Sequence, residues 1–385
     1  MPDDDTLTAF RRTLHAHPEP SGAEHATHDR IAAFLRDHAP GAERVERLGG
    51  TGLAAIINPR QRGRTILYRA DHDALRLHER TAAPHASTAP GVMHACGHDG
   101  HTTIACALAS RLAADPPPDA RVVILFQPAE ETGTGARAVL DDPRFADLAP
   151  DAALAIHNLP GVPLGRAVLR EGIACPASVG LELILDGVPG HFAEPHSAQP
   201  HAARSPLPPA AALVDPITRS PETLGIAHAL VTVTTINTGP LDFGRTPARA
   251  TLGVTLRAHT DADRARLMDH ATSLARRAAD EHALTLTTRE HEPFPALVND
   301  ARVARAVRDG LRAIGHDPIE PAGAFPWSED FAHIARSCPA VLLGIGAGED
   351  TPHLHADTYD YPDALTPIAV PTLEHIIRTL SAGGI

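Results

Sequence analysis

The sequence predicts an α/β domain interrupted by a smaller α+β domain, and three observations support this. In the first part of the chain, strand-like apolar runs alternate with helical segments, which is typical of an α/β domain with a mostly parallel sheet. The segments that follow have the order strand, helix, strand, strand, helix, strand, the split βαβ or ferredoxin-like arrangement. A helix and a buried strand then return. We therefore expect an α/β domain in two parts, 1–175 and 291–385, with an inserted domain at 176–290.

The first 160 residues supply the elements of the α/β domain. Helical spacing from Thr6 to Pro18, and again over 22–40, predicts two helices that end at prolines. Apolar runs bounded by glycine or by Asn-Pro predict strands, and the near-continuous run "ARVVILFQ" is typical of a strand buried on both faces. The expected strands are 51–59, 64–75, 120–131 and 152–160, and the expected helices between them are 98–114 and 133–142.

Alternating apolar and polar residues mark the inserted domain. The stretch "ASVGLELILDG" at 177–187 alternates as a half-exposed strand does. A long amphipathic helix at 261–283 has Asp261 as its expected N-cap. The remaining expected elements are a helix at 206–219 and strands at 228–237, 248–259 and 284–292, followed after the insertion by a helix at 299–315 and a strand at 339–346.

Composition and charge narrow the classes of partner and compartment. Lys plus Arg number 34 against 47 Asp plus Glu, a formal charge of -13, which argues against nucleic acid or an anionic membrane surface as partner. The four cysteines (Cys96, Cys106, Cys175, Cys338) have no framework spacing and indicate reduced thiols. The start "MPDDDTLTAFRRTL" lacks the features of an export signal, and no run of apolar residues is long enough to span a membrane. We expect a soluble, cytoplasmic protein.

Polar residues follow several predicted strands at their carboxyl ends, where open α/β sheets bind ligands. With 25 histidines in the chain, a single histidine carries little information, so the argument depends on clusters at matching positions. The stretches are "RADHDAL", "MHACGHDGH", "QPAEE", "AIHNLP" and "LHADTYDYP". They contribute Asp71 and Asp73, Cys96 and His98, Glu130 and Glu131, His157, and His355.

The residue types in these stretches suit a metal site. Cys96 and His98 are two positions apart at the start of a helix, so they cannot share a helix face, but they suit a loop that wraps a metal ion. Thiolate, imidazole and carboxylate ligands together fit zinc best, with manganese, cobalt and nickel as further candidates. Of the adjacent Glu130 and Glu131, one can bind metal while the other acts as general base on water.

Two other interpretations of these residues remain open at this stage. The glutamate pair by itself is also typical of a solvated turn. Cys96 could be the nucleophile of a cysteine hydrolase, with His94 or His98 as its base. The cysteine hydrolase interpretation leaves four residues without a role: Glu130, Glu131, His157 and His355.

The motifs "RADHDAL", "MHACGHDGH", "QPAEE", "HNLP", "SEDF" and "LHADTYDY" occur in the order, and at about the separations, seen in the aminoacylase/carboxypeptidase-type binuclear metallohydrolases. The chain resembles in particular their amidohydrolase branch, which holds hippurate hydrolases and auxin-conjugate hydrolases. The resemblance covers nearly the whole chain. It implies a zinc-exopeptidase-like mixed sheet flanked by helices, with the ferredoxin-like insertion serving as a lid and dimerisation domain.

The resemblance also implies two divalent metal ions per subunit, zinc or manganese first, and assigns roles to residues. Cys96 matches the ligand that bridges both ions. Glu130 matches the general base that passes a proton from water to the leaving amine, and Asp73 matches the carboxylate that orients an imidazole ligand, His98. The metal ligands matched in this way are Cys96, His98, Glu131, His157 and His355.

Two residues of the inserted domain match substrate-binding positions of the family. His191, in "GVPGHFAEPH", matches a histidine that polarises the scissile carbonyl, often from a partner subunit. Arg257 matches an arginine that binds the substrate carboxylate, for which a planar guanidinium is well suited. The chain departs from the family pattern at Gly244, where relatives usually carry an asparagine that helps to bind the carboxylate, and at His72, where methionine is usual.

The expected function is metal-dependent hydrolysis of the amide bond of an N-acyl amino acid. Within the same family the alternative is a dipeptidase or carboxypeptidase acting on a short peptide. From a different class, a catalytically silent ligand-binding protein on this fold is the other alternative. The resemblance further implies a homodimer formed through the inserted domain.

Overall fold

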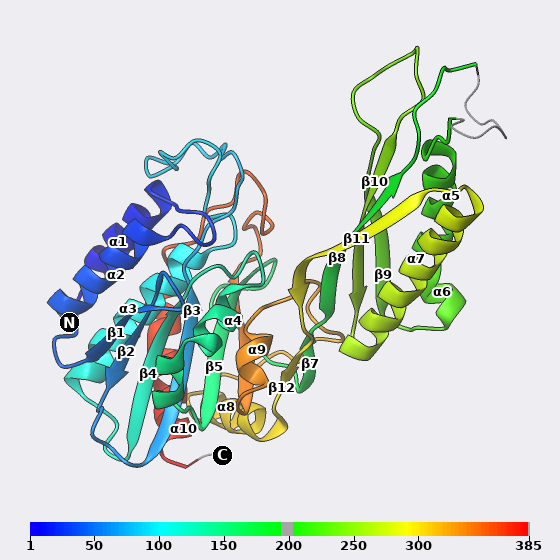
Figure 1. The fold of residues 1–385 in the computed structure, drawn as a ribbon. Helices are drawn as coiled ribbons and strands as arrows, with labels where there is room; N and C mark the ends of the chain where they lie inside the picture. The colour runs from blue at the N-terminus through cyan, green and yellow to red at the C-terminus, as the bar shows by residue number, and fades with distance from the viewer. Residues whose placement is uncertain (194–202, 384–385) are drawn as a thin grey trace. The chain divides into compact units, whose positions relative to one another are not determined.

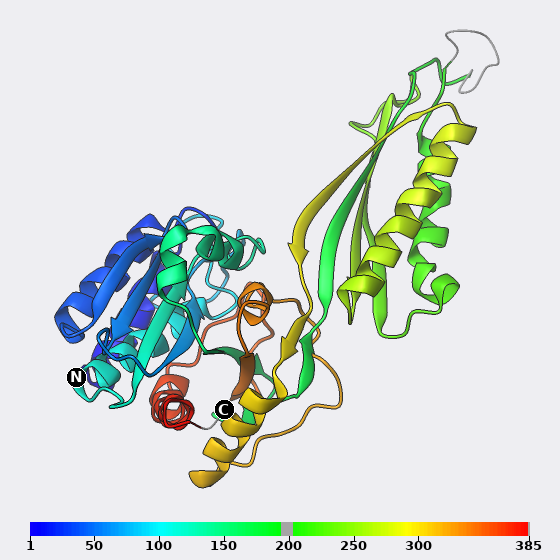
Figure 2. The same cartoon turned by 60° about the horizontal axis from the view of Figure 1, so that its bottom comes forward.

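The computed structural model describes residues 1–193 and 203–383, which form two compact units (Figures 1 and 2). The first unit comprises Met1–Ala174, Leu297–Ala324 and Glu329–Ile385; the second comprises Cys175–Ala296 and Phe325–Ser328. Each unit has its own hydrophobic core. The four residues 325–328 belong to the second unit, although the sequence pattern assigned the range 291–385 to the α/β domain.

A seven-stranded mixed sheet forms the centre of the first unit, which confirms the predicted α/β class. The middle strands β4, β3, β5 and β13 run parallel, whereas β1, β2 and β6 join the two edges in antiparallel orientation. In spatial order the strands are β1 (Glu43–Leu48), β2 (Gly52–Ile57), β4 (Ala120–Gln127), β3 (Arg64–Asp71), β5 (Ala152–Pro160), β13 (Ala340–Gly348) and β6 (Ala167–Val168).

Helices cover this sheet, and α3 packs against its central strands β3, β4 and β5. Apolar residues such as Ile104 and Leu108 of α3 pack with Leu35, Leu373 and the central strands in one core cluster. Helices α3 and α10 lie against each other in Figure 1. The helices are α1 (Asp4–Ala16), α2 (His25–His38), α3 (His98–Ala114), α4 (Gly135–Asp141), α8 (Ala301–Ala313), α9 (Ala332–Ala335) and α10 (Leu365–Ser381), with a 3₁₀ turn η1 (Pro143–Asp147) and a small pair of strands β7 (Gly172–Cys175) and β12 (Leu297–Asn299).

The parallel strands end at one edge of the sheet and thereby position the candidate site. Asp71, the last residue of β3, pairs with Gln127, the last residue of β4. The segments that leave these strands therefore begin side by side, and His157 lies near the same end of β5. This is the edge at which open α/β sheets bind ligands.

The second unit is a four-stranded antiparallel sheet with the strand order β11-β8-β10-β9. Helices α5, α6 and α7 lie on one side of this sheet (Figures 1 and 2). Helix α7 is capped by the side chain of Thr260, which accepts from the Asp263 N–H, so the expected cap Asp261 is instead the first helical residue. The elements are β8 (Ala177–Asp186), α5 (Leu207–Thr218), α6 (Ser220–Leu224), β9 (Ala229–Asn237), β10 (Arg249–Ala258), α7 (Asp261–Glu281) and β11 (Thr285–Phe294).

Within residues 1–193 and 203–383, none of the helices combines the length and the apolar character needed to cross a membrane.

Candidate metal centre

Four segments of the first unit bring potential metal ligands together. Cys96 and His98 lie where the chain enters α3, and Glu131 lies on the turn that follows β4. His157 lies on β5, and His355 lies on the segment between β13 and α10, with a left-handed backbone (φ 64°). Sequence positions about 260 residues apart thus contribute to one site.

Cys96 belongs to two groups of ligand atoms, and within each group all atoms lie within 4.8 Å of one another. One group is Cys96 with His98 and His157, and the other is Cys96 with Glu131 and His355. The Cys96 Sγ lies 3.5 Å from the His157 Nε2, and the His355 Nε2 lies 3.7 Å from a Glu131 carboxylate oxygen. The Cys96 side chain is thus within reach of both sets of candidate ligands.

Unsatisfied polar atoms in the site fit a bound cation. The His98 Nε2 and the Glu131 Oε1 are buried and have no hydrogen-bond partner among the described residues, and they lie 3.9 Å apart. A buried polar atom without a partner costs about 1–3 kcal/mol. A metal ion between these atoms would remove that cost, because both are common metal ligands.

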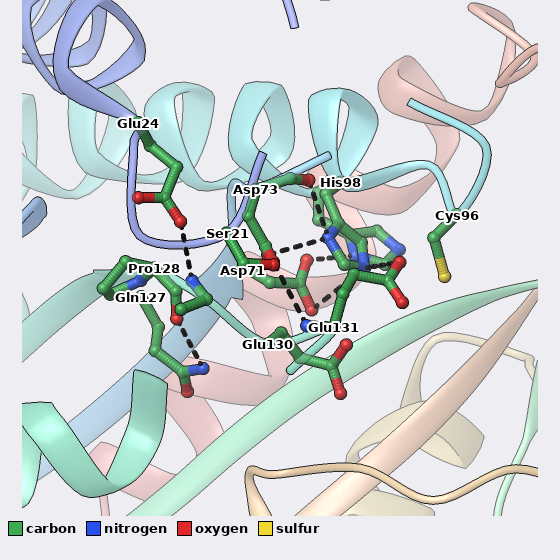
Figure 3. A network of polar contacts seen from close by, with 12 residues as sticks. Ser21, Glu24, Asp71, Asp73, Cys96, His98, Gln127, Pro128, Glu130 and Glu131 are labelled. Carbon is green, nitrogen blue, oxygen red and sulfur yellow. Dashed lines mark hydrogen bonds and ion pairs between the residues drawn. The ribbon is translucent and has the colours of Figure 1, made fainter. Parts of the chain in front are cut away.

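Asp73 accepts hydrogen bonds from two of the candidate ligands, His98 and Glu131 (Figure 3). The His98 Nδ1 lies 3.0 Å from the Asp73 carbonyl oxygen and 3.3 Å from its Oδ1, so the Nδ1–H donates to Asp73 and the Nε2 is left for another partner. The same carboxylate accepts from the Ser21 hydroxyl at 2.7 Å and from the Glu131 N–H at 3.1 Å. Asp73 therefore holds two of the expected ligands at once.

Burial shifts the pKa values of three further candidate ligands, Cys96, Glu131 and His157. Burial raises the pKa of the Cys96 thiol well above its usual range, and it raises the pKa of Glu131 to about 8. Burial, followed by the neighbouring His101, lowers the pKa of His157 to about 3, so this imidazole is neutral at pH 7. Neutral imidazole is the form that binds metal, and a bound cation favours the deprotonated thiol and carboxyl groups.

Glu130 lies beside the ligands in a strongly acidic, buried environment. Its carboxylate is grouped within 4.8 Å with His98 and Glu131, and separately with Glu329 and Asp330. Burial raises the pKa of Glu130 well above its usual range, and the carboxylates of Glu329 and Glu131 raise it further. A carboxyl group with a raised pKa takes up a proton more readily than an ordinary one, which suits general base and acid work.

Arg69 balances much of this negative charge. Its guanidinium is fully buried and donates to Asp71 at 2.6 Å and to Glu329 and Asp330 at 2.8 Å each. The Gln127 side chain also donates to Asp330, at 2.8 Å and 3.0 Å. Glu329 and Asp330 belong to the family motif "SEDF". The sequence alone assigns them no role, because their role depends on the contact with Arg69.

The structure places the two expected substrate-binding residues in the second unit. His191 is exposed and pairs through the backbone with Arg245, next to Gly244. Arg257, on β10, donates to the Pro326 carbonyl oxygen, and its Nε has no partner within the described ranges. The end of the motif "GVPGHFAEPH", residues 194–196, lies outside the described residues.

Comparisons with known proteins show the family of this chain. The model of the Peptidase family M20/M25/M40 matches residues 67–379. The chain belongs to this family. An N-acetylcysteine deacetylase of Bacillus subtilis is 31% identical over 366 residues, covering 94% of this chain and 93% of that protein. An N-acetyldiaminopimelate deacetylase of Exiguobacterium sibiricum is 28% identical over 375 residues, covering 96% and 98%.

Solved structures with similar sequences show the same fold. A putative aminohydrolase from methicillin-resistant Staphylococcus aureus has a TM-score of 0.83 at 26% identity, covering 97% of this chain and 96% of that chain. The Bacillus subtilis YXEP protein, described as a dinuclear metal binding peptidase of the M20 family, has a TM-score of 0.80 at 25% identity and covers 98% of both chains. The family resemblance inferred from the motifs is confirmed, and this M20/M25/M40 chain is a hydrolase of amide bonds.

Proposed function

We propose that the protein hydrolyses the amide bond of N-acyl amino acids with two divalent metal ions. The observation that carries this proposal is the position of Cys96 in two groups of ligand atoms, each within 4.8 Å. Relatives named as deacetylases of N-acetylcysteine and N-acetyldiaminopimelate support small N-acyl amino acids as the substrate class. The products are the carboxylic acid of the acyl group and the free amino acid.

The proposed ligand set explains why these residue types occur together. Thiolate, imidazole and carboxylate favour zinc or manganese, with cobalt and nickel as further candidates. Bound metal ions would polarise the scissile carbonyl and lower the pKa of a water molecule in the site. We assign the ligand roles to Cys96, His98, Glu131, His157 and His355.

Glu130 is the proposed general base. It takes one proton from the attacking water as the new C–O bond forms, and it returns that proton to the amine nitrogen as the C–N bond breaks. The direction of its pKa shift supports the second step, because a carboxyl group with a raised pKa holds the proton more firmly until the amine takes it. Asp73 acts through His98: it accepts a hydrogen bond from the His98 Nδ1–H and so orients the imidazole ring.

The second unit is proposed to bind the rest of the substrate. Arg257 would bind the carboxylate of the amino acid, since a guanidinium fits a carboxylate with two hydrogen bonds. His191, which is exposed, would donate to the scissile carbonyl oxygen. On this proposal the second unit is a lid and the dimerisation element of a cytoplasmic homodimer.

The substitution Glu130→Gln tests the catalytic assignment. Glutamine keeps the size and polarity of the side chain but cannot take up a proton, so kcat for N-acetyl amino acid hydrolysis should fall by about 100- to 10,000-fold. Metal content, measured by elemental analysis, should stay at the wild-type level.

The matched control is Glu374→Gln on α10, where the carboxylate pairs with Arg111 and Arg378. This variant should keep both turnover and metal. Wild-type turnover in Glu130→Gln would refute the assignment of Glu130 as the base.

A further inference from the structure

Asn158 is fully buried directly after the proposed ligand His157, and its side chain contacts three residues on two other segments. Its Nδ2 donates to the Cys96 carbonyl oxygen at 2.7 Å and to the His101 Nε2 at 3.0 Å. Its Oδ1 accepts from the Tyr359 hydroxyl at 2.6 Å. Its backbone carbonyl accepts from the His157 Nδ1 at 2.9 Å. Asn158 thus contacts the segments that carry Cys96 and His157. Through Tyr359 it also contacts the segment that carries His355, which lies four positions earlier.

The contacts of Asn158 also fix the tautomer of His101. The His101 Nε2 accepts from the Asn158 backbone N–H at 3.2 Å as well as from its Nδ2. The ring proton therefore sits on Nδ1, which donates to Asp71 at 2.7 Å. Arg69 holds the other oxygen of that carboxylate at 2.6 Å. The hydrogen-bonded network thus runs from Asn158 to the end of β3.

The backbone at Gly97 provides an independent observation. Gly97 lies between Cys96 and His98 with a φ of 90°, a conformation that other residues rarely adopt. A Cβ atom there would lie 2.6 Å from the Asn158 Nδ2 and 2.8 Å from the Tyr359 hydroxyl oxygen. The glycine between two ligands therefore leaves the space that Asn158 and Tyr359 occupy.

We propose that Asn158 is a positioning residue of the metal centre. It holds the segments that carry Cys96, His157 and His355 in fixed relative positions, and it acts through them without contacting metal or substrate. The inference rests on the proposed function, because it presupposes that these three residues bind metal. Residues that orient metal ligands contribute about 10- to 100-fold to metal affinity.

The substitution Asn158→Asp tests the proposal. Aspartate keeps the size and the acceptor for Tyr359, but it loses the donor to the Cys96 carbonyl and places a carboxylate against it. Metal dissociation constants from chelator competition should rise by about 10- to 100-fold. In the cobalt-substituted protein, the thiolate-to-cobalt absorption band should shift, because the Cys96 segment is no longer held.

Asn299→Asp is the matched control. Asn299 is also buried, and its Nδ2 donates to the Arg170 and Leu342 carbonyls at 2.8 Å and 3.0 Å. Its Oδ1 accepts from the Leu342 N–H at 2.7 Å. The control should lose stability as Asn158→Asp does, yet keep wild-type metal affinity and the wild-type cobalt spectrum. An equal loss of metal affinity in both variants, or wild-type affinity in Asn158→Asp, would overturn the proposal.

Tyr359→Phe provides a second, milder test that does not depend on Asn158→Asp folding. It removes only the hydroxyl that donates to the Asn158 Oδ1, so a smaller rise in the metal dissociation constant and a shifted cobalt band are expected. An unchanged band and affinity would overturn the proposal. A wild-type protein that binds no metal would instead refute the proposed function, and this result is obtained before any variant is compared.

Discussion

His72 lies fully buried between Asp71 and Asp73, and neither of its ring nitrogens has a hydrogen-bond partner in the described part of the chain. An unsatisfied buried donor or acceptor costs about 1–3 kcal/mol. The resemblance to the amidohydrolase branch indicates methionine as the usual residue at this position. His72→Met should therefore raise the free energy of unfolding by about 1–3 kcal/mol, measured by denaturant titration with chelator present throughout.

The same substitution should reduce the loss of stability in acid. Burial lowers the pKa of His72 to about 3 in the folded protein, whereas an unfolded histidine has a pKa of about 6.5. Below about pH 6.5 the unfolded state binds the proton first, so this histidine reduces stability as the pH falls toward 3. The exposed His25→Met serves as control and should keep the wild-type pH dependence. An equal acid dependence in His72→Met and wild type would contradict this account.

At the residue scale, polar residues clustered near the ends of predicted strands indicated the candidate stretches, and the family resemblance selected the five expected ligands among them. Arg69 and Asn158 could not be found in this way, since a buried arginine or asparagine carries no pattern of its own. Their roles depend on partners such as Glu329 and Tyr359, which lie about 200 or more residues away along the chain. Only the fold brings these partners together.

Among the elements, α3 shows how closely the sequence is matched to packing. Gly100, in its first turn, lies against the ring of Tyr361, and a Cβ atom there would lie 2.3 Å from ring carbons. The ring is buried at 1% exposure and has little room to move. Gly100→Ala should therefore destabilise the protein by about 1–3 kcal/mol in thermal or denaturant unfolding, although alanine is the better helix former.

Gly310→Ala on α8 is the control for this prediction. A Cβ atom at Gly310 would find its nearest neighbour, the Thr379 hydroxyl, at 3.3 Å. This variant should change stability much less than Gly100→Ala. Equal effects of the two substitutions would show that helix propensity, and not the contact with Tyr361, determines the outcome.

Helix α3 and the central strands were predicted close to their observed ranges because their apolar spacing is clear. Several elements had no such signal, and β1 and α10 are the longest of the helices and strands in this group that the sheet and core of the first unit contain. Strand β1, "ERVERL", is mostly polar and partly exposed at the edge of the sheet, so its residues show no buried run. Helix α10 contains Pro371, and because proline usually breaks or kinks a helix, its sequence does not predict a continuous one; the helix nevertheless packs against α3 and α8.

For the whole molecule, the order of elements predicted a mixed α/β fold, and the family comparison confirms it. The sequence did not indicate that 325–328 contact the second unit while Glu329 and Asp330 return to the first. Local periodicity carries no information about which unit a four-residue segment joins. Contacts between distant residues decide it.

The account depends most directly on a binuclear metal centre that hydrolyses N-acyl amino acids. The decisive measurement is a titration of chelator-treated, metal-free protein with zinc, manganese or cobalt while hydrolysis of N-acetyl, N-benzoyl and indoleacetyl amino acids is followed. We expect no hydrolysis without metal, and full activity at two ions per chain. Hydrolysis by the metal-free protein, or its loss on alkylation of cysteine without any effect of the chelator, would contradict it.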